Sequence, residues 1–238
     1  MKNRGGLALG PPDSDSDPDP SDSQTIRARL FGASVWLNIT VLVLFSPALF
    51  VVLGWFTESY RDTASASEVS HRVHEVAFGA LFCLALVGAY SQFRPKHNLA
   101  GMLQLIAAVV LLAFMTTFSI GIDVGLLLYL IPLAILLALR PWGGPVREGG
   151  VWGLALILVL VSALPFLDET AGLISRALSG AQNHTSHWSA MATFVIILPV
   201  LGLVAALRFT GYRLVAWSVS AAAAVYGSAS LLFPYDAS

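Results

Sequence analysis

The chain has 238 residues, of which 56% are hydrophobic and only 11% are charged. Because a soluble domain usually carries about 25% charged residues, this balance excludes an ordinary soluble globular domain. Thirteen Lys and Arg against fourteen Asp and Glu give a net charge of -1, so the chain has no overall excess of positive charge to hold a nucleic acid through its phosphates. The single cysteine, Cys83, lies in an apolar run, which excludes an intramolecular disulfide and a cysteine-only zinc site.

Residues 1–29 predict a disordered acidic tail on the cytoplasmic side. The first 24 residues combine glycine and proline with five aspartates and have almost no large apolar side chain, a composition that cannot bury a core. The segment lacks the charged-then-apolar order of a cleavable signal peptide. We therefore expect the first membrane helix to act as an uncleaved targeting signal.

Residues 30–238 predict an all-α, polytopic membrane domain with seven transmembrane helices. Apolar runs of about 17 to 26 residues have the length that crosses a hydrocarbon core of ~30 Å. The seven runs are 31–56, 73–93, 99–118, 124–139, 151–167, 188–207 and 214–233. The six tryptophans all fall in loops or near the ends of these runs, as expected of an interfacial belt.

The distribution of Lys and Arg predicts the orientation of these helices. With seven helices and the N-terminus inside, ten Lys and Arg side chains fall on the inner side and only three, Arg61, Arg72 and Arg176, on the outer side. Positive charge accumulates in cytoplasmic loops. The sequence therefore predicts a multi-pass protein of the plasma membrane with its N-terminus in and its C-terminus out, and its expected partner is the lipid bilayer.

An internal duplication is suggested when the sequence is shifted against itself by 116 residues. The shift superposes residues 35–50 on 151–166 with seven identities in sixteen positions, and it places Ser70-His71 on Ser186-His187. Repeat units at about 31–118 and 151–233 would match helices 1–3 with helices 5–7. Because helix 4 returns the chain to the same side, we expect a parallel repeat about an axis along the membrane normal.

Four of the five histidines lie where the two long outer loops, 57–70 and 168–186, meet the next helix. In the first, Glu68, His71 and Glu75 have the spacing of one helical face, with His74 beside them; in the second, His184 and His187 are spaced i, i+3. Imidazole binds haem iron, zinc or copper, and a carboxylate can complete a metal shell. The candidate metal ligands are His71, His74, His184, His187, Glu68 and Glu75. The alternative is that these side chains cap helices and meet interfacial water.

Glu68-Val69-Ser70-His71-Arg72 reads ExxHR at the outer start of the second predicted helix, and this pattern resembles the heme A synthase family, a duplicated membrane fold. The resemblance covers the first two helices and His187. It implies Glu68 as a catalytic-type carboxylate, with His71 and His187 as haem ligands. That family has eight helices with partner histidines on the fourth and eighth, so we expect a related haem-binding role rather than haem A synthesis itself.

No ionisable side chain lies at mid-membrane depth in the third to seventh runs, which disfavours a proton- or sodium-coupled transporter. Asn38, Thr40, Gln104 and Tyr129 are polar residues that either line an uncoupled path or join helices by hydrogen bonds. Two functions are therefore expected. One is a membrane protein that binds haem or a transition metal at its outer histidines, and the other is a non-catalytic membrane component or an uncoupled small-molecule permease.

Overall fold

The computed structural model describes residues 20–45, 71–121, 123–179 and 185–232. Within these ranges the chain is helical and contains no β-strand, and its β-type pairing is an isolated antiparallel bridge between Arg147 and Phe209. Its seven α-helices, with two short 3-10 turns, are α1 (Pro20–Leu44), α4 (His71–Ser91), η2 (Pro95–His97), α5 (Leu99–Ile120), η3 (Val124–Leu126), α6 (Leu127–Leu139), α7 (Gly153–Leu178), α8 (Thr185–Ala206) and α9 (Tyr212–Leu232).

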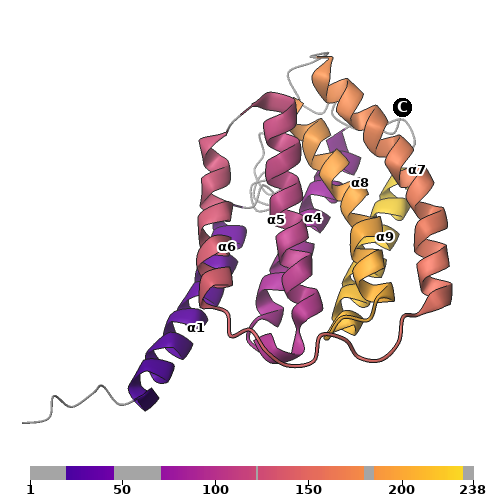
Figure 1. The fold of residues 1–238 in the computed structure, drawn as a ribbon. Helices are drawn as coiled ribbons and strands as arrows, with labels where there is room; N and C mark the ends of the chain where they lie inside the picture. Colours follow the sequence, from indigo (N-terminus) through magenta and orange to yellow (C-terminus); the bar gives the residue numbers. More distant parts are fainter. Residues whose placement is uncertain (1–19, 46–70, 122, 180–184, 233–238) are drawn as a thin grey trace, which may run out of the picture.

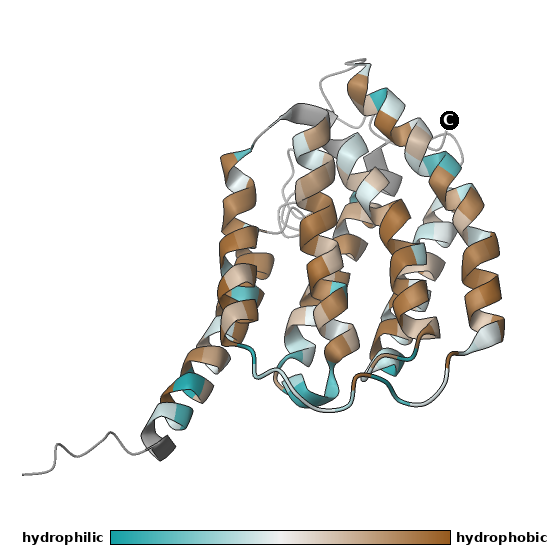
Figure 2. Cartoon of the chain, in the orientation of Figure 1, coloured by the Kyte–Doolittle hydropathy of each residue, from teal (hydrophilic) through white to brown (hydrophobic). Residues whose placement is uncertain are grey.

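Five of these helices, α1, α5, α7, α8 and α9, are long and apolar enough to cross a membrane. The apolar parts of α4 (Glu75–Ser91) and α6 with its preceding turn (Val124–Leu139) are shorter. Hydrophobic residues cover the helices, and hydrophilic residues concentrate in the loops at the lower end and in the first turns of α1 (Figure 2). The all-α architecture expected from the sequence is therefore confirmed, and five of its helices are able to span a membrane.

Successive helices run in opposite directions, so that α4, α6 and α8 descend in Figure 1 while α5, α7 and α9 rise. Helices α4, α5, α8 and α9 pack together, with α5 against α8 and α4 against α9. Helix α7 lies on α8, and α1 packs against α4 and α6. The C-terminal end of α9 lies at the end of the bundle opposite to the first turn of α1 (Figure 1).

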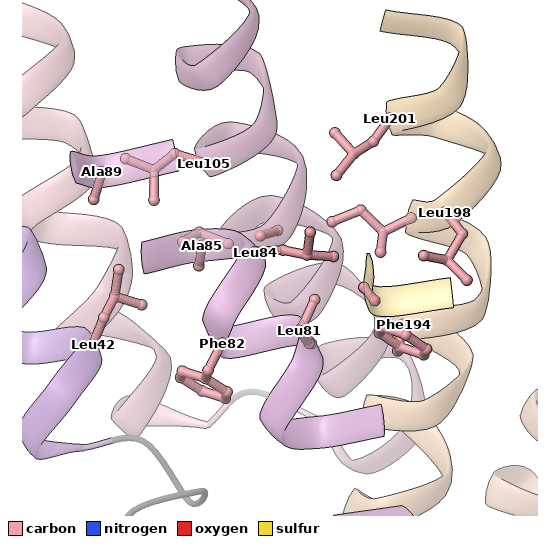
Figure 3. Packing of buried hydrophobic residues seen from close by; sticks show 14 of the residues in the cluster. Leu42, Leu81, Phe82, Leu84, Ala85, Ala89, Leu105, Phe194, Leu198 and Leu201 are labelled. Atoms are coloured by element: carbon pink, nitrogen blue, oxygen red, sulfur yellow. The ribbon is translucent and has the colours of Figure 1, made fainter. Parts of the chain in front are cut away.

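The hydrophobic core is centred on the contact between α4 and its neighbours. Figure 3 shows Leu81 and Leu84 of α4 on the side that faces α8, whereas Leu42 of α1 lies near the opposite side of α4. The α8 side of this contact is formed by fully or almost fully buried side chains, namely Phe194, Leu198 and Leu201. Because lipid tails are as apolar as these side chains, it is their close van der Waals packing that holds α4 at the centre of the bundle.

The outward surface of the bundle is apolar, as a lipid-exposed surface requires. On α7 the exposed fractions of Leu154, Val161 and Leu164 are 64%, 64% and 70%. A soluble protein rarely exposes a contiguous patch of this kind, which in a helical bundle of this composition marks contact with lipid.

Two boundaries differ from those expected. Helix α1 begins at Pro20, inside the predicted tail of residues 1–29. A proline is tolerated at the first position of a helix, because its missing N–H would have no intrahelical partner. Residues 1–19 and the whole of the first predicted outer loop, 57–70, lie outside the described residues.

The predicted outer loop 168–186 is wrong over most of its length, because α7 continues to Leu178. Three buried residues of this extension, Thr170, Leu173 and Ala177, have the i, i+3, i+7 spacing of a helical stripe. At 1.5 Å per residue, its 26 residues extend about 39 Å, which exceeds the hydrocarbon core of ~30 Å. The last turns of α7 therefore extend beyond the hydrocarbon core.

Candidate functional site

The sequence-predicted outer residues fall only partly within the described chain. His71 and His74 are in the first turn of α4, and His187 is in the first turn of α8. The structure gives helical backbone at these three positions and does not describe their side chains. Glu68 and His184 lie outside the described residues. Glu75 follows in α4 with a half-buried side chain that has an interaction partner.

The two helices that begin with these histidines are neighbours. α4 and α8 contact one another, and both begin at the upper end of the bundle in Figure 1. We call this end the histidine end: the first turns of α4 and α8. The fold thus brings His71-Arg72-Val73-His74 of α4 and Thr185-Ser186-His187 of α8, which are far apart in sequence, to helix starts at the same end.

The last turns of α7 also reach the histidine end. The Arg176 guanidinium carbon lies 5.3 Å from the centre of the Trp188 ring, so the end of α7 packs on the first turns of α8. An arginine above an indole ring is a favourable cation–π contact. Trp188 follows directly after His187, and this contact therefore fixes the start of α8 against its neighbour.

Among the residues whose side chains are described, no three His, Cys, Asp or Glu gather in a group able to hold a metal ion. This finding does not bear on metal binding by His71, His74, His184 and His187, because the structure does not describe their side chains. Cys83, which lies in the middle of α4 and is exposed on the bundle surface, belongs to no such group.

The polar side chains in the bundle interior join helices. The Gln104 amide nitrogen in α5 donates to the Leu84 carbonyl of α4 at 2.6 Å, and its oxygen accepts from the Ser218 hydroxyl of α9 at 3.2 Å. The Asn38 amide in α1 donates to the Pro132 carbonyl of α6 at 2.8 Å. Two roles were expected for Asn38 and Gln104, either lining an uncoupled path or joining helices by hydrogen bonds. These partners favour the second role.

Sequence reasoning missed a polar network at the opposite end of the bundle. Arg140 follows α6 and is only 3% exposed. Its Nε donates to Oε1 of Gln92 at 3.2 Å, and its Nη2 donates to the Pro95 carbonyl at 2.7 Å. The Trp142 ring centre lies 4.6 Å from the guanidinium carbon. Burial lowers the pKa of Arg140 from its ordinary value, because desolvation disfavours the charged form.

Three loops meet around this network, and we call them together the basic end: residues 92–98, 140–152 and 206–213. The Ala100 N–H donates to the Thr210 carbonyl at 2.9 Å, and the Glu148 N–H donates to the Arg208 carbonyl at 2.8 Å. The three loops carry six cations and one carboxylate, which are Arg94, Lys96, Arg140, Arg147, Arg208, Arg213 and Glu148.

No protein-family model, curated protein or solved structure matches this chain. The resemblance to heme A synthase therefore stays a prediction that rests on the ExxHR pattern and on His187.

Proposed function

We propose that this chain is a multi-pass plasma-membrane protein that binds haem or a transition-metal ion at its histidine end. The observation that carries the proposal is the placement of α4 and α8. These neighbouring helices begin at the same end of the bundle, and each begins at a segment that reads HxxH.

Two HxxH segments on neighbouring helices supply the ligand type that such a site needs. Residues three apart lie on one side of a helix, so His71 and His74 would offer two imidazoles to the same space, and the second segment carries two more imidazoles in its sequence. Four imidazoles suit zinc or copper, and one imidazole from each helix suits a haem iron. When bound, haem would supply one-electron chemistry, whereas zinc would supply a Lewis acid.

The charges of the described chain support the proposed orientation. The basic end holds six cations against one carboxylate. The charged side chains described near the opposite end of the bundle are mainly acidic. They are Glu75 near the start of α4, Asp123 before η3, and Asp168, Glu169 and the one cation Arg176 in the last turns of α7. Because positive loops stay in the cytoplasm, the histidine end would face outward.

The helix contacts support the proposed repeat. In the proposed repeat α4 corresponds to α8, and α5 corresponds to α9. The packing of α5 on α8 then has its counterpart in the packing of α9 on α4, and both contacts are present. A twofold relation of this kind would place His71 and His187 in equivalent positions.

The test is an absorption spectrum with elemental analysis of protein purified gently from its native membrane. We expect a Soret band or a stoichiometric metal in the wild type, and its loss in His71→Ala/His74→Ala and in His184→Ala/His187→Ala. His97→Ala is the matched control, because this exposed histidine lies in η2 at the basic end.

The proposal would be refuted if the protein from native membranes is colourless and metal-free and also fails to bind added haem, Zn²⁺ and Cu²⁺. Equal loss in His97→Ala would also count against it, because binding would then not depend on the histidine end. Either result would favour the alternative of a non-catalytic membrane component or an uncoupled permease.

A further inference from the structure

A groove of about 270 Å³ lies on the bundle surface between α7, α8 and α9. α8 contacts both of the other helices and lies between them. It contributes short side chains to the groove, Gly202, Ala205 and Ala206, and α9 contributes Ala216 and Ala223. Val159 of α7 packs against Gly202, with Cγ2 3.0 Å from where a Cβ on the glycine would lie. The small alanines of α8 and α9 leave the rest of the groove open.

The groove runs along the helices from the basic end toward the middle of the bundle. At its lower end the Trp152 N–H donates to the Ala206 carbonyl at 2.9 Å, which joins the start of α7 to the end of α8. Its α9 side extends from Tyr212 to Ala223, a rise of about 17 Å at 1.5 Å per residue. That length matches one leaflet of a hydrocarbon core that is ~30 Å thick.

The lower end of the groove is cationic. The guanidinium carbons of Arg208 and Arg213 lie 5.0 Å and 6.0 Å from the centre of the Tyr212 ring, which lines the groove. The Nε of Arg208 is buried, and no described residue accepts a hydrogen bond from it. The neighbouring carboxylate of Glu148 accepts from the Gly211 N–H at 2.7 Å.

The backbone of Arg208 adopts an unusual conformation that the basic end holds in place. Its φ is +54°, and it is the residue other than glycine with positive φ in the described chain. This conformation costs a side-chain-bearing residue about 1–2 kcal/mol. The Glu148 N–H bond to the Arg208 carbonyl fixes the segment, and strain retained in this way often marks a binding site.

We propose that this groove binds one anionic phospholipid, with an acyl chain along α7, α8 and α9 and its phosphate against Arg208 and Arg213. The apolar lining suits the chain, and the lower end offers guanidinium groups where the headgroup of that leaflet lies. A zwitterionic headgroup would bring a compensating positive charge to the same arginines. The charge at the groove end therefore selects an acidic lipid.

The test is native mass spectrometry of the full chain after delipidation and incubation with phosphatidylglycerol or phosphatidylcholine of identical acyl chains. We expect one tightly retained phosphatidylglycerol. Since an interfacial cation contributes about 1 kcal/mol toward an acidic lipid, Arg213→Gln should weaken retention about fivefold, and Arg208→Gln/Arg213→Gln tenfold or more. The exposed Arg213 makes the single variant safe for folding.

Two matched controls separate the groove from the general charge of the basic end. Arg147→Gln removes the same charge from a residue that stacks on Phe209 at 5.4 Å, and it should leave retention unchanged. Ala223→Leu fills the groove and should abolish retention, whereas Ala221→Leu, on an exposed part of α9 outside the groove, should not.

Three outcomes would overturn the proposal. They are equal retention of phosphatidylcholine, an equal loss in Arg147→Gln and Arg213→Gln, or full retention in Ala223→Leu. The first removes the charge selectivity, the second reduces it to nonspecific attraction, and the third places the lipid outside the groove.

Discussion

The Nε of Arg140 donates to Oε1 of Gln92 at 3.2 Å, across 48 residues of sequence and between two side chains that are almost fully buried. Within the described chain no carboxylate lies within ion-pair distance of this guanidinium, which uses Gln92 and the Pro95 carbonyl in its place. A buried cation is stable only when its donors are satisfied. The pair therefore joins the α4–α5 connection to the segment after α6.

We predict that Gln92→Leu destabilises the protein by about 1.5–3 kcal/mol, because it removes an acceptor from a buried charged group. The measurement is the free energy of unfolding in mild detergent. Gln104→Leu is a comparison variant, since it is the same substitution at another fully buried glutamine that faces no charge but joins three helices. A Gln92→Leu variant as stable as the wild type would show that the Arg140 contact contributes nothing.

Gln104 itself links three helices, and its contribution can be isolated. We predict a coupling of about 0.6 kcal/mol between Gln104 and Ser218, the average for hydrogen bonds in membrane proteins. The measurement is a double-mutant cycle with Gln104→Leu, Ser218→Ala and the combined variant. Additive effects of the two substitutions would contradict the hydrogen bond between Ser218 and Gln104.

The close approach of α4 and α5 depends on Gly88. A Cβ at this position would lie 2.8 Å from the Gly101 carbonyl oxygen and 2.8 Å from the Leu105 nitrogen, both of which are backbone atoms. We therefore predict that Gly88→Ala lowers the free energy of unfolding by about 1–3 kcal/mol, as overpacking does.

Gly227→Ala is the control for this prediction, because a Cβ on that glycine of α9 has no neighbour within 4 Å. Alanine is the better helix former by about 1 kcal/mol, so the control should be neutral or stabilising. A Gly88→Ala variant as stable as the wild type would mean that α4 and α5 are less closely packed.

The long apolar runs predicted the described helices, although α1 begins at Pro20 and not at residue 31. Hydropathy over about 20 residues determines what crosses a bilayer. The end of α7 was not predicted, because the apolar run ends at residue 167 and Asp168 and Glu169 follow it. The buried stripe of Thr170, Leu173 and Ala177 was the available signal. Residues of opposite polarity can share a helix when only one side is buried.

The basic-end network is harder to predict. Arg140 at the end of an apolar run was informative about orientation, but its bond to Gln92 depends on how two distant loops meet. A contact between distant loops leaves no periodic pattern of apolar residues in the sequence. The histidine segments were conspicuous in sequence because two similar patterns recur, and the fold adds the observation that their helices are neighbours.

The orientation can be tested with one reactive cysteine at each end. Cys83 is first replaced by alanine, and Lys96→Cys or Val124→Cys is then introduced; Lys96 is exposed in η2 at the basic end, and Val124 is 73% exposed at the opposite end. Because basic loops stay inside, a membrane-impermeant maleimide should label the Val124→Cys variant in intact cells. The Lys96→Cys variant should be labelled only after permeabilisation. The reverse pattern would place the histidine end inside, and the proposed haem or metal site would then face the cytoplasm.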